Sequence, residues 1–299
     1  DWSPENITAE DAPRAVREYL ETLDDAAFGA ASPVKPKFTS HSDPASHWTG
    51  ARGGPAYFAY STNYLIDTDN GVILGVEATC SIRQAEVGAT RTMIGRVRER
   101  HDLKPERLIA DTAYGSGPML GWLVDQDIAP HIPVIDKSGR SDGTFERADV
   151  TFDAENDAYI CPGGKELKQY RRAFTKPREP KPDKDGILRY RARKSDCDTC
   201  LLKSRCCPKE PQRKVTRSIY EPSRDVARAI AQTTRYAISC KLRKKVEMLF
   251  AHLKRILGLG RLRLGGPCGA RDEVHLAATA QNLRKLAKLL PLPQKPRPA

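Results

Sequence analysis

The sequence has no run of apolar residues long enough to cross a bilayer, and it has no amino-terminal signal peptide. The sequence as given therefore offers no segment that would span a membrane. No internal repeat is present either. The chain also has no initial Met and begins Asp1-Trp2-Ser3-Pro4, so we expect a fragment, a processed product or a truncated reading frame.

The composition is that of a folded, basic protein. The chain has 299 residues, of which 39% are hydrophobic, enough for a real core in one large domain or one domain with an insertion. It carries 50 Lys and Arg against 38 Asp and Glu, a formal net charge of +12. The excess favours a polyanionic partner, most simply nucleic acid, although a merely soluble basic protein has the same charge.

The first half alternates strands and helices. Residues 8–28 have helical spacing, 29–56 are read as a linker, and residues 58–67 and 72–79 form a hairpin around the turn Asp69-Asn70-Gly71. A helix is expected over 84–100. A strand over 107–111, a helix through Trp122 and a strand over 131–134 then read as a βαβ unit with a parallel pair, so the sheet is mixed.

The second half interrupts this pattern. Residues 137–218 are rich in Lys, Arg, Pro, Asp and Cys and are read as an insertion, whereas helical spacing returns over 223–257 and 270–290. The predicted division is an N-terminal helix and linker, a first core part, a Cys-rich basic insertion, a helical second core part and a Pro-rich tail: 1–56, 57–136, 137–218, 219–291 and 292–299.

Asp111 ends an apolar strand and precedes Thr112-Ala113-Tyr114-Gly115-Ser116. Carboxylates at the carboxyl ends of strands in α/β sheets point into the functional crevice, and phosphoryl transfer needs hard oxygen ligands for a metal. Asp111 is therefore a candidate metal ligand. The alternative, equally supported by the pattern, is that it caps the following turn or helix.

A charged face runs beside the apolar stripe of the late helix. Arg243, Glu247 and Lys254 fall on one side, next to Val246, Leu249, Phe250, Leu253 and Leu257. Glu247 could complete a metal site while the two cations grip phosphate. A solvated face with intrahelical ion pairs is the alternative, and the pattern alone favours it.

Five of the eight cysteines fall between Cys161 and Cys207. In a reducing compartment such clustering favours metal binding over disulfides. Cys161, Cys197, Cys200 and either Cys206 or Cys207 would make a tetrahedral Cys₄ site of the kind that holds structural Zn²⁺, against the alternative of unliganded thiols. Cys80, Cys240 and Cys268 are isolated and are read as small apolar fillers.

Cations surround these cysteines, with Tyr170 and Tyr190 among them, and suit contact with a phosphate backbone. A solvated insertion kept soluble by charge is the alternative. The cations are Lys165, Lys168, Arg171, Arg172, Lys176, Arg189, Arg191, Arg193, Lys194, Lys203 and Arg205.

Three segments, in the same order along the chain as in the family, resemble the DDE transposases of bacterial insertion sequences. The first, Ala110–Ser116, is similar to the family's second-aspartate motif, and the last, His275–Leu283, is similar to its terminal helix. Arg243, Glu247 and Lys254 match the spacing of the late-helix signature Tyr-x2-Arg-x3-Glu-x6-Lys, although Cys240 occupies the Tyr position. The resemblance spans about Asp43 to Leu290.

The resemblance implies an α/β, RNase H-like mixed sheet flanked by helices, with the Cys-rich module inserted. Three carboxylates would hold two Mg²⁺ ions for DNA strand cleavage and transfer, with Asp111 second and Glu247 third. Arg243, Lys254 and Tyr114 would contact DNA. The expected partners are double-stranded DNA, the transposon ends and a second copy of the chain, in the bacterial cytoplasm at the nucleoid.

The first carboxylate of the family lies on the first strand, before the hairpin, in an Asp-Gly-Thr type of motif. The match here, Asp142-Gly143-Thr144, comes too late, inside the insertion. The first strand is therefore expected upstream of Asp1, with Asp67 as the best substitute within the chain, although Asp67 also suits a turn. An inactive DNA-binding fragment and an unrelated zinc-containing DNA-binding protein remain alternatives. An enzyme with a cysteine nucleophile is a weaker one.

Overall fold

The computed structural model describes residues 12–50, 53–136, 139, 141–169 and 181–290. The chain has a mixed α/β fold and divides into two compact units. Unit 1 comprises 1–109 and 234–299, and unit 2 comprises 110–233. None of the described helices is long and apolar enough to span a membrane.

Unit 1 is built on a three-stranded antiparallel sheet in the order β1 (His47–Thr49), β2 (Tyr57–Ile66), β3 (Ile73–Cys80). The hairpin between β2 and β3 confirms the predicted pair of strands. Its turn is closed by Asp67, whose N–H donates to Val72, and by Gly71, whose φ of +69° lies in the left-handed region that glycine tolerates.

Strand β1 corrects one expectation. Residues 29–56 are not all linker, because His47, Trp48 and Thr49 pair antiparallel with Ala59, Phe58 and Tyr57. A short strand that precedes the hairpin therefore lies within the chain. Three residues are too few to show the alternation that identifies a strand in a sequence.

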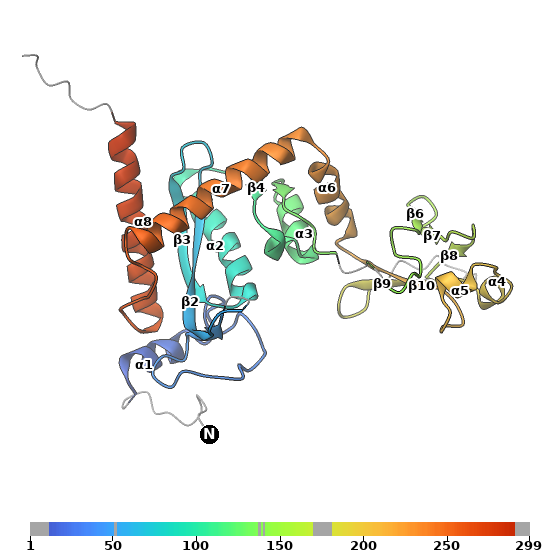
Figure 1. The fold of residues 1–299 in the computed structure, drawn as a ribbon, viewed down its shortest axis with the longest axis horizontal. Coiled ribbons are helices and arrows are strands. Elements are labelled where there is room, and N and C mark those ends of the chain that lie inside the picture. The colour runs from blue at the N-terminus through green and yellow to red at the C-terminus, as the bar shows by residue number, and fades with distance from the viewer. Residues whose placement is uncertain (1–11, 51–52, 137–138, 140, 170–180, 291–299) are drawn as a thin grey trace, which may run out of the picture. The chain divides into compact units, whose positions relative to one another are not determined.

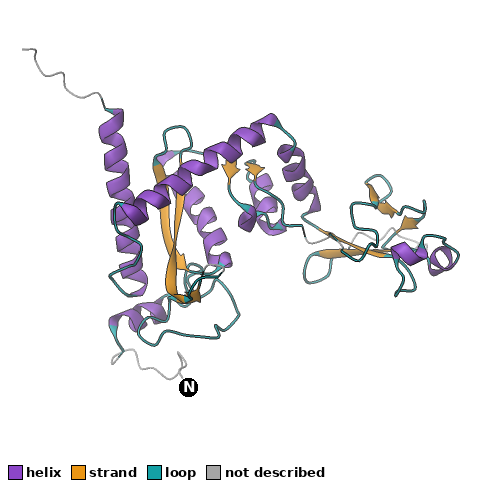
Figure 2. Ribbon diagram, in the orientation of Figure 1, coloured by secondary structure: helices purple, strands orange, loops and turns teal. Residues whose placement is uncertain are grey.

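Strand β3 is buried along nearly its whole length because helices cover both of its faces. Helices α2 (Arg83–His101) and α8 (Gly266–Leu289) flank it, as Figures 1 and 2 show. On the α8 side, Val76 and Ala78 pack with small side chains of that helix: Ala270, Val274 and Ala278. On the α2 side, Gly75 leaves room for Met93, which a Cβ at Gly75 would approach to 3.1 Å.

The remaining elements of unit 1 are α1 (Arg14–Glu21), β4 (Arg107–Ile109) and α7 (Thr234–Arg255). The apolar stripe predicted for the late helix docks α7 on the sheet. Phe250 stacks on Tyr64 with ring centroids 4.9 Å apart, Leu249 joins the same core, and Leu253 is buried. Leu257 lies beyond the helix end and is partly exposed.

Unit 2 begins with a short 3-10 helix, η2 (Thr112–Tyr114), followed by α3 (Gly117–Asp125) and β5 (Ala129–His131), and it ends with α6 (Glu221–Ala231). The single helix expected over 223–257 is thus two helices. The N–H groups of Gln232 and Thr233 bond back to Ala229 and Ile230 and end α6 at the boundary between the units.

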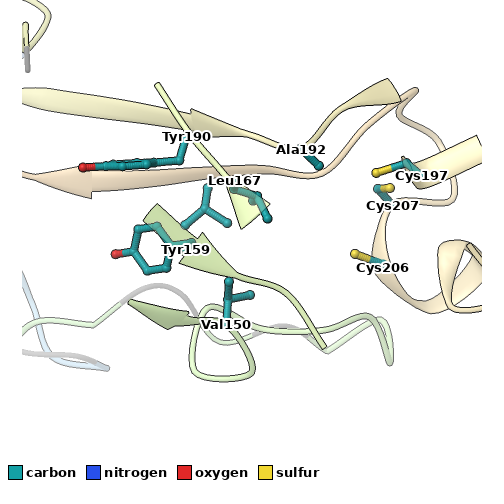
Figure 3. Packing of buried hydrophobic residues seen from close by; sticks show 9 residues of the cluster. Val150, Tyr159, Leu167, Tyr190, Ala192, Cys197, Cys206 and Cys207 are labelled. Carbon is teal, nitrogen blue, oxygen red and sulfur yellow. The ribbon is translucent and has the colours of Figure 1, made fainter. Parts of the chain in front are cut away.

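Between β5 and α6 lies the Cys-rich module, which is made of short elements. They are β6 (Thr151–Asp153), β7 (Ala158–Ile160), β8 (Glu166–Leu167), β9 (Ile187–Arg191), α4 (Lys194–Asp198), α5 (Lys203–Cys206) and β10 (Lys214–Ser218). Its small core holds Tyr159, Leu167 and Tyr190 at the centre and three cysteines at one end (Figure 3).

Candidate functional site

Asp111 lies at the start of η2, in unit 2. Its Oδ1 accepts the N–H of Ala113 at 2.8 Å. Asp111 therefore caps the following turn, which was the alternative role predicted from the sequence. The side chain is exposed, and no other hydrogen bond to the Asp111 carboxylate occurs within the described residues. One carboxylate oxygen therefore remains available to a ligand from solvent.

The loop after Asp111 is held tightly. A Cβ at Gly115 would come within 1.9 Å of the Pro133 carbonyl oxygen, so only glycine fits there. The carbonyl of Gly115 also accepts the N–H of Ile135 at 2.9 Å. Tyr114, the predicted DNA contact, sits half-buried in η2 beside this loop. The position of Asp111 is thus fixed by packing around its neighbours.

Glu247, Arg243 and Lys254 lie on α7, in unit 1. The Glu247 side chain is 67% exposed, and its Oε1 is 4.0 Å from Nε of Arg243. The intrahelical pair favoured by the pattern therefore exists, but at the limit of ion-pair distance. An exposed pair of this kind contributes little to stability, so the fold does not depend on Glu247 at this position.

The Tyr position of the late-helix signature is held by Cys240. One turn earlier on α7 lies Tyr236, whose hydroxyl contacts the Cys240 side chain. Burial, then the nearby Cys240, raises the pKa of Tyr236. A tyrosine is therefore available on the same side of the helix. The sequence reading missed it because the motif was matched at one spacing only.

Asp67 caps the hairpin turn. Its carboxylate accepts the backbone N–H groups of Asp69 and Asn70, both at 2.9 Å, and the Asn70 side-chain amide at 2.8 Å. Burial acts to raise the pKa of Asp67, but these hydrogen bonds and the nearby Lys245 outweigh it, so the pKa is lowered. These bonds favour the turn-capping role of Asp67 over a metal-binding one.

Asp43 was missed by the sequence reading. It lies four residues before β1, where its Oδ2 accepts the N–H of Gly266 at 2.9 Å and its Oδ1 accepts the Tyr60 hydroxyl. The carboxylate therefore caps the N-terminus of α8, an end that favours negative charge. The only sequence signal was its position in Ser42-Asp43-Pro44, ahead of a strand too short to recognise.

The five clustered cysteines meet in the module. Cys161, Cys197, Cys200, Cys206 and Cys207 all line one cavity of about 20 Å³. All eight cysteines of the chain are free thiols. Across the described parts of the chain, no group of three or more His, Cys, Asp or Glu side chains is arranged so that it could hold a metal ion as it stands.

The other three cysteines differ from one another. Cys80 is fully buried in β3, and burial raises the pKa of its thiol to about 12, as expected of an apolar filler. Cys240 is half-buried. Cys268 is exposed on α8, so its reading as a core filler was wrong. Its neighbours Pro267 and Gly269 are buried instead, which the helical pattern did not reveal.

Several cations of the module are paired with acids of the same surface. Lys168 pairs with Glu166 at 2.8 Å, and Lys203 pairs with Asp198 at 2.7 Å. Arg189 pairs with Asp183 at 2.8 Å. Tyr190 is buried, with its hydroxyl bonded to Asp157, so it is a core residue rather than a DNA contact. Tyr170, Arg171, Arg172 and Lys176 lie outside the described residues.

Residues 160–287 match the family model described as transposase DDE domain. A comparison with curated proteins gave no match, and neither did one with solved structures. The match includes the cysteines of the module, the whole of α7 and most of α8. The resemblance to DDE transposases is therefore confirmed, in a segment that contains Glu247 but not Asp111.

Proposed function

We propose that this chain carries the catalytic core of an insertion-sequence transposase, with an RNase H-like fold, that cleaves DNA strands and transfers them. The observation that carries the proposal is the match of residues 160–287 to the transposase DDE domain, because it includes the signature of α7. The antiparallel strands β1, β2 and β3, followed by α2, are consistent with the proposed fold.

Asp111 and Glu247 are the proposed metal ligands. Both are exposed oxygen donors, the kind that Mg²⁺ prefers, and each has little of its hydrogen-bonding capacity used within the protein. Two Mg²⁺ ions, when bound, supply activation of the attacking hydroxyl and stabilisation of the leaving oxygen. Arg243 and Lys254 would hold the phosphate backbone beside Glu247, and Tyr114 would contact DNA beside Asp111.

Asp43 is the better candidate for the first carboxylate, with Asp67 as the alternative. The family's first carboxylate lies on a strand before the hairpin, and β1 is such a strand. Asp43 lies four residues ahead of β1, whereas Asp67 follows β2 and is held in its turn by three hydrogen bonds. The partners would be double-stranded transposon ends and a second copy of the chain.

A nicking assay on supercoiled DNA with Mg²⁺ or Mn²⁺ tests the proposal. Cleavage by the unaltered chain should fall to background in Glu247→Gln and in Asp111→Asn. Asp272→Asn, an exposed acid within the same matched segment, is the control and should cleave normally. Asp43→Asn and Asp67→Asn then distinguish the two candidates, since only the metal ligand should abolish cleavage in a chain that remains folded.

DNA binding without metal-dependent cleavage would instead favour the second candidate, an inactive fragment that only binds DNA. If Glu247→Gln kept both DNA binding and metal-dependent cleavage, Glu247 would not be a metal ligand. Folding of each variant is checked by circular dichroism, so that loss of structure is not mistaken for loss of a ligand.

A further inference from the structure

The cavity lined by the five cysteines has an unusual charge balance. Three cations line it, Lys165, Lys203 and Arg213, against a single carboxylate, Asp196. The lining therefore carries a surplus of positive charge around a space of about 20 Å³, which is room for a water-sized species.

Arg213 is a buried cation of this lining, with only 5% of its surface exposed. Its Nη1 donates to the carbonyl of Cys206 at 2.9 Å, and its Nη2 donates to the carbonyl of Phe145 at 2.9 Å. Its Nε is buried without a partner, and no ion pair to Arg213 occurs within the described residues. A buried guanidinium without a counter-charge is costly, so an anion next to Arg213 would stabilise it.

The turn at Cys161 is built to support a thiolate. The N–H of Lys165 donates to Cys161 Sγ at 3.3 Å, and the N–H of Gly164 donates to the Cys161 carbonyl at 2.8 Å. Gly164 has φ of +71°, a conformation that side chains rarely adopt. Backbone N–H groups that point at a sulfur are the outer-shell contacts that orient and stabilise a metal-bound thiolate.

The other cysteines face the same space. A Cβ placed on Gly163 would lie 3.5 Å from Cys200 Sγ and 3.7 Å from Cys161 Sγ, so these two sulfurs flank one small residue. The Cys207 thiol contacts those of Cys197 and Cys206, and Figure 3 shows these three together at one end of the module core. Cys206 is near Cys161, Cys197 and Cys207, and Cys207 is near Cys197 and Cys206.

We infer that Cys161, Cys197, Cys200 and Cys206 form a structural zinc site and that Arg213 is its buried counter-cation. Each thiol loses its proton to solvent when it binds Zn²⁺, and four thiolates around one Zn²⁺ carry a net charge of −2, which supplies the anion that Arg213 lacks. The thiols surround a cavity and not one point, so binding must draw them inward. Cys207 lines the same cavity and contacts Cys197 and Cys206, so it is the alternative fourth ligand.

The small core of the module also suggests that the module needs additional stabilisation, which a structural metal would provide. Its strands have only two to five residues, and its core is a single small cluster. A core of this size seldom stabilises a fold alone, and a structural metal is a common remedy. The inference does not rest on the proposed transposase activity, because metal content is measured without DNA.

Zinc analysis of the full chain, purified under reducing conditions, tests the site. We expect one Zn²⁺ per chain in the unaltered protein and in Cys207→Ser and Cys240→Ser. Zinc should be lost in Cys200→Ser and Cys206→Ser. Retention by Cys206→Ser with loss in Cys207→Ser would overturn the choice of fourth ligand.

Two measurements keep the test independent of variants that fail to fold. Unaltered protein, stripped of metal and loaded with Co²⁺, should show the visible bands of tetrahedral thiolate coordination. Arg213→Gln should bind zinc about 10- to 100-fold more weakly, the range for loss of an outer-shell partner, while its exposed neighbour Lys214→Gln should not. Protein that contains no zinc while all eight thiols are reduced, or a disulfide within the module found by mass, would overturn the inference.

Discussion

Glu221 carries the sharpest prediction about stability. It lies at the first residue of α6, is 1% exposed, and accepts bonds from Arg147 at 2.7 Å, Arg228 at 2.7 Å and Arg224 at 3.2 Å. Arg147 also donates to Tyr159 in the module core, and Arg224 donates to the Ile135 carbonyl. One carboxylate thus joins the module, α6 and the segment beside the Asp111 loop.

The change to make is Glu221→Gln, which keeps the shape and removes the charge. Removing one partner of a buried ion pair costs about 3–5 kcal/mol, because the remaining charges are left buried. Arg228 can relax, since it is 34% exposed and also pairs with Asp225, but Arg147 and Arg224 are only 21% and 16% exposed. We therefore expect a loss of about 3 kcal/mol, the lower end of that range.

Hydrogen exchange measured by mass spectrometry reports this loss for each segment separately. Protection should fall in peptides from α6 and β7, while peptides from β2 and β3, in the other unit, should be unchanged. Glu210→Gln is the matched control, because Glu210 pairs with Lys214 on the exposed surface and should give no change. A loss below about 0.5 kcal/mol in Glu221→Gln would refute the reasoning.

The effect should also depend on pH. Burial acts to raise the pKa of Glu221, but hydrogen bonds from Arg228 and Arg147 outweigh it, so the pKa lies below its ordinary 4.5. A lowered pKa contributes stability that is present above the unfolded value and is lost as pH falls through the folded one. The difference between Glu221→Gln and the unaltered chain should therefore be full at neutral pH and shrink below about pH 4.5.

Two further predictions concern single atoms. Burial raises the pKa of Tyr64 to about 12, and its hydroxyl has no partner in the described structure. Tyr64→Phe should raise the free energy of unfolding by up to about 1 kcal/mol, whereas Tyr60→Phe, which loses the bond to Asp43, should lower it by about 1 kcal/mol. Urea denaturation of both variants checks this, and a destabilised Tyr64→Phe would contradict it. A Cβ at Gly121 would lie 2.6 Å from Tyr220 Cδ1, so Gly121→Ala should cost about 1–3 kcal/mol. Gly88→Ala, on a helix face with open space, should instead gain about 0.5–1 kcal/mol in the same assay.

The elements with strong periodicity were predictable from the sequence. The hairpin of β2 and β3 follows from alternating aromatic and β-branched residues around Asn70-Gly71, and α2 and α8 follow from helical spacing. The start of α8 was misplaced, because Gly265-Gly266-Pro267 reads as a break, whereas Pro267 occupies the first turn, where its missing N–H costs nothing. The break between α6 and α7 contains no Pro or Gly, so the sequence did not predict it.

The candidate site was predictable only where side chains repeat along one element. Arg243, Glu247 and Lys254 lie on one helix, so their spacing in the sequence predicts which side of the helix each of them occupies. Asp43 could not be found in this way, because its partners Tyr60 and Gly266 are distant in the sequence. Arg213 looks like any other surface cation in Gln212-Arg213-Lys214, and only the fold shows that it is buried.

Burial and pairing of cations also change what the net charge of the module means for DNA binding. The sequence offers eleven cations around the cysteines, but Lys168, Arg189 and Lys203 are already paired with nearby acids. Neutralising a phosphate releases counterions, and the slope of log K against log salt is about −0.9 for each phosphate neutralised on duplex DNA. Paired cations should contribute less to that slope.

Arg193 and Lys194 are exposed and have no ion pair within the described residues, so they are the better candidates for phosphate contact. The double variant Arg193→Gln, Lys194→Gln should lower the magnitude of the salt slope by about 2, measured by fluorescence anisotropy with labelled duplex DNA. Lys203→Gln, whose charge is already balanced by Asp198, should lower it by clearly less than one phosphate. Equal losses per residue in the two variants would mean that the surface pairs open when DNA binds, and the formal charge would then be the right guide after all.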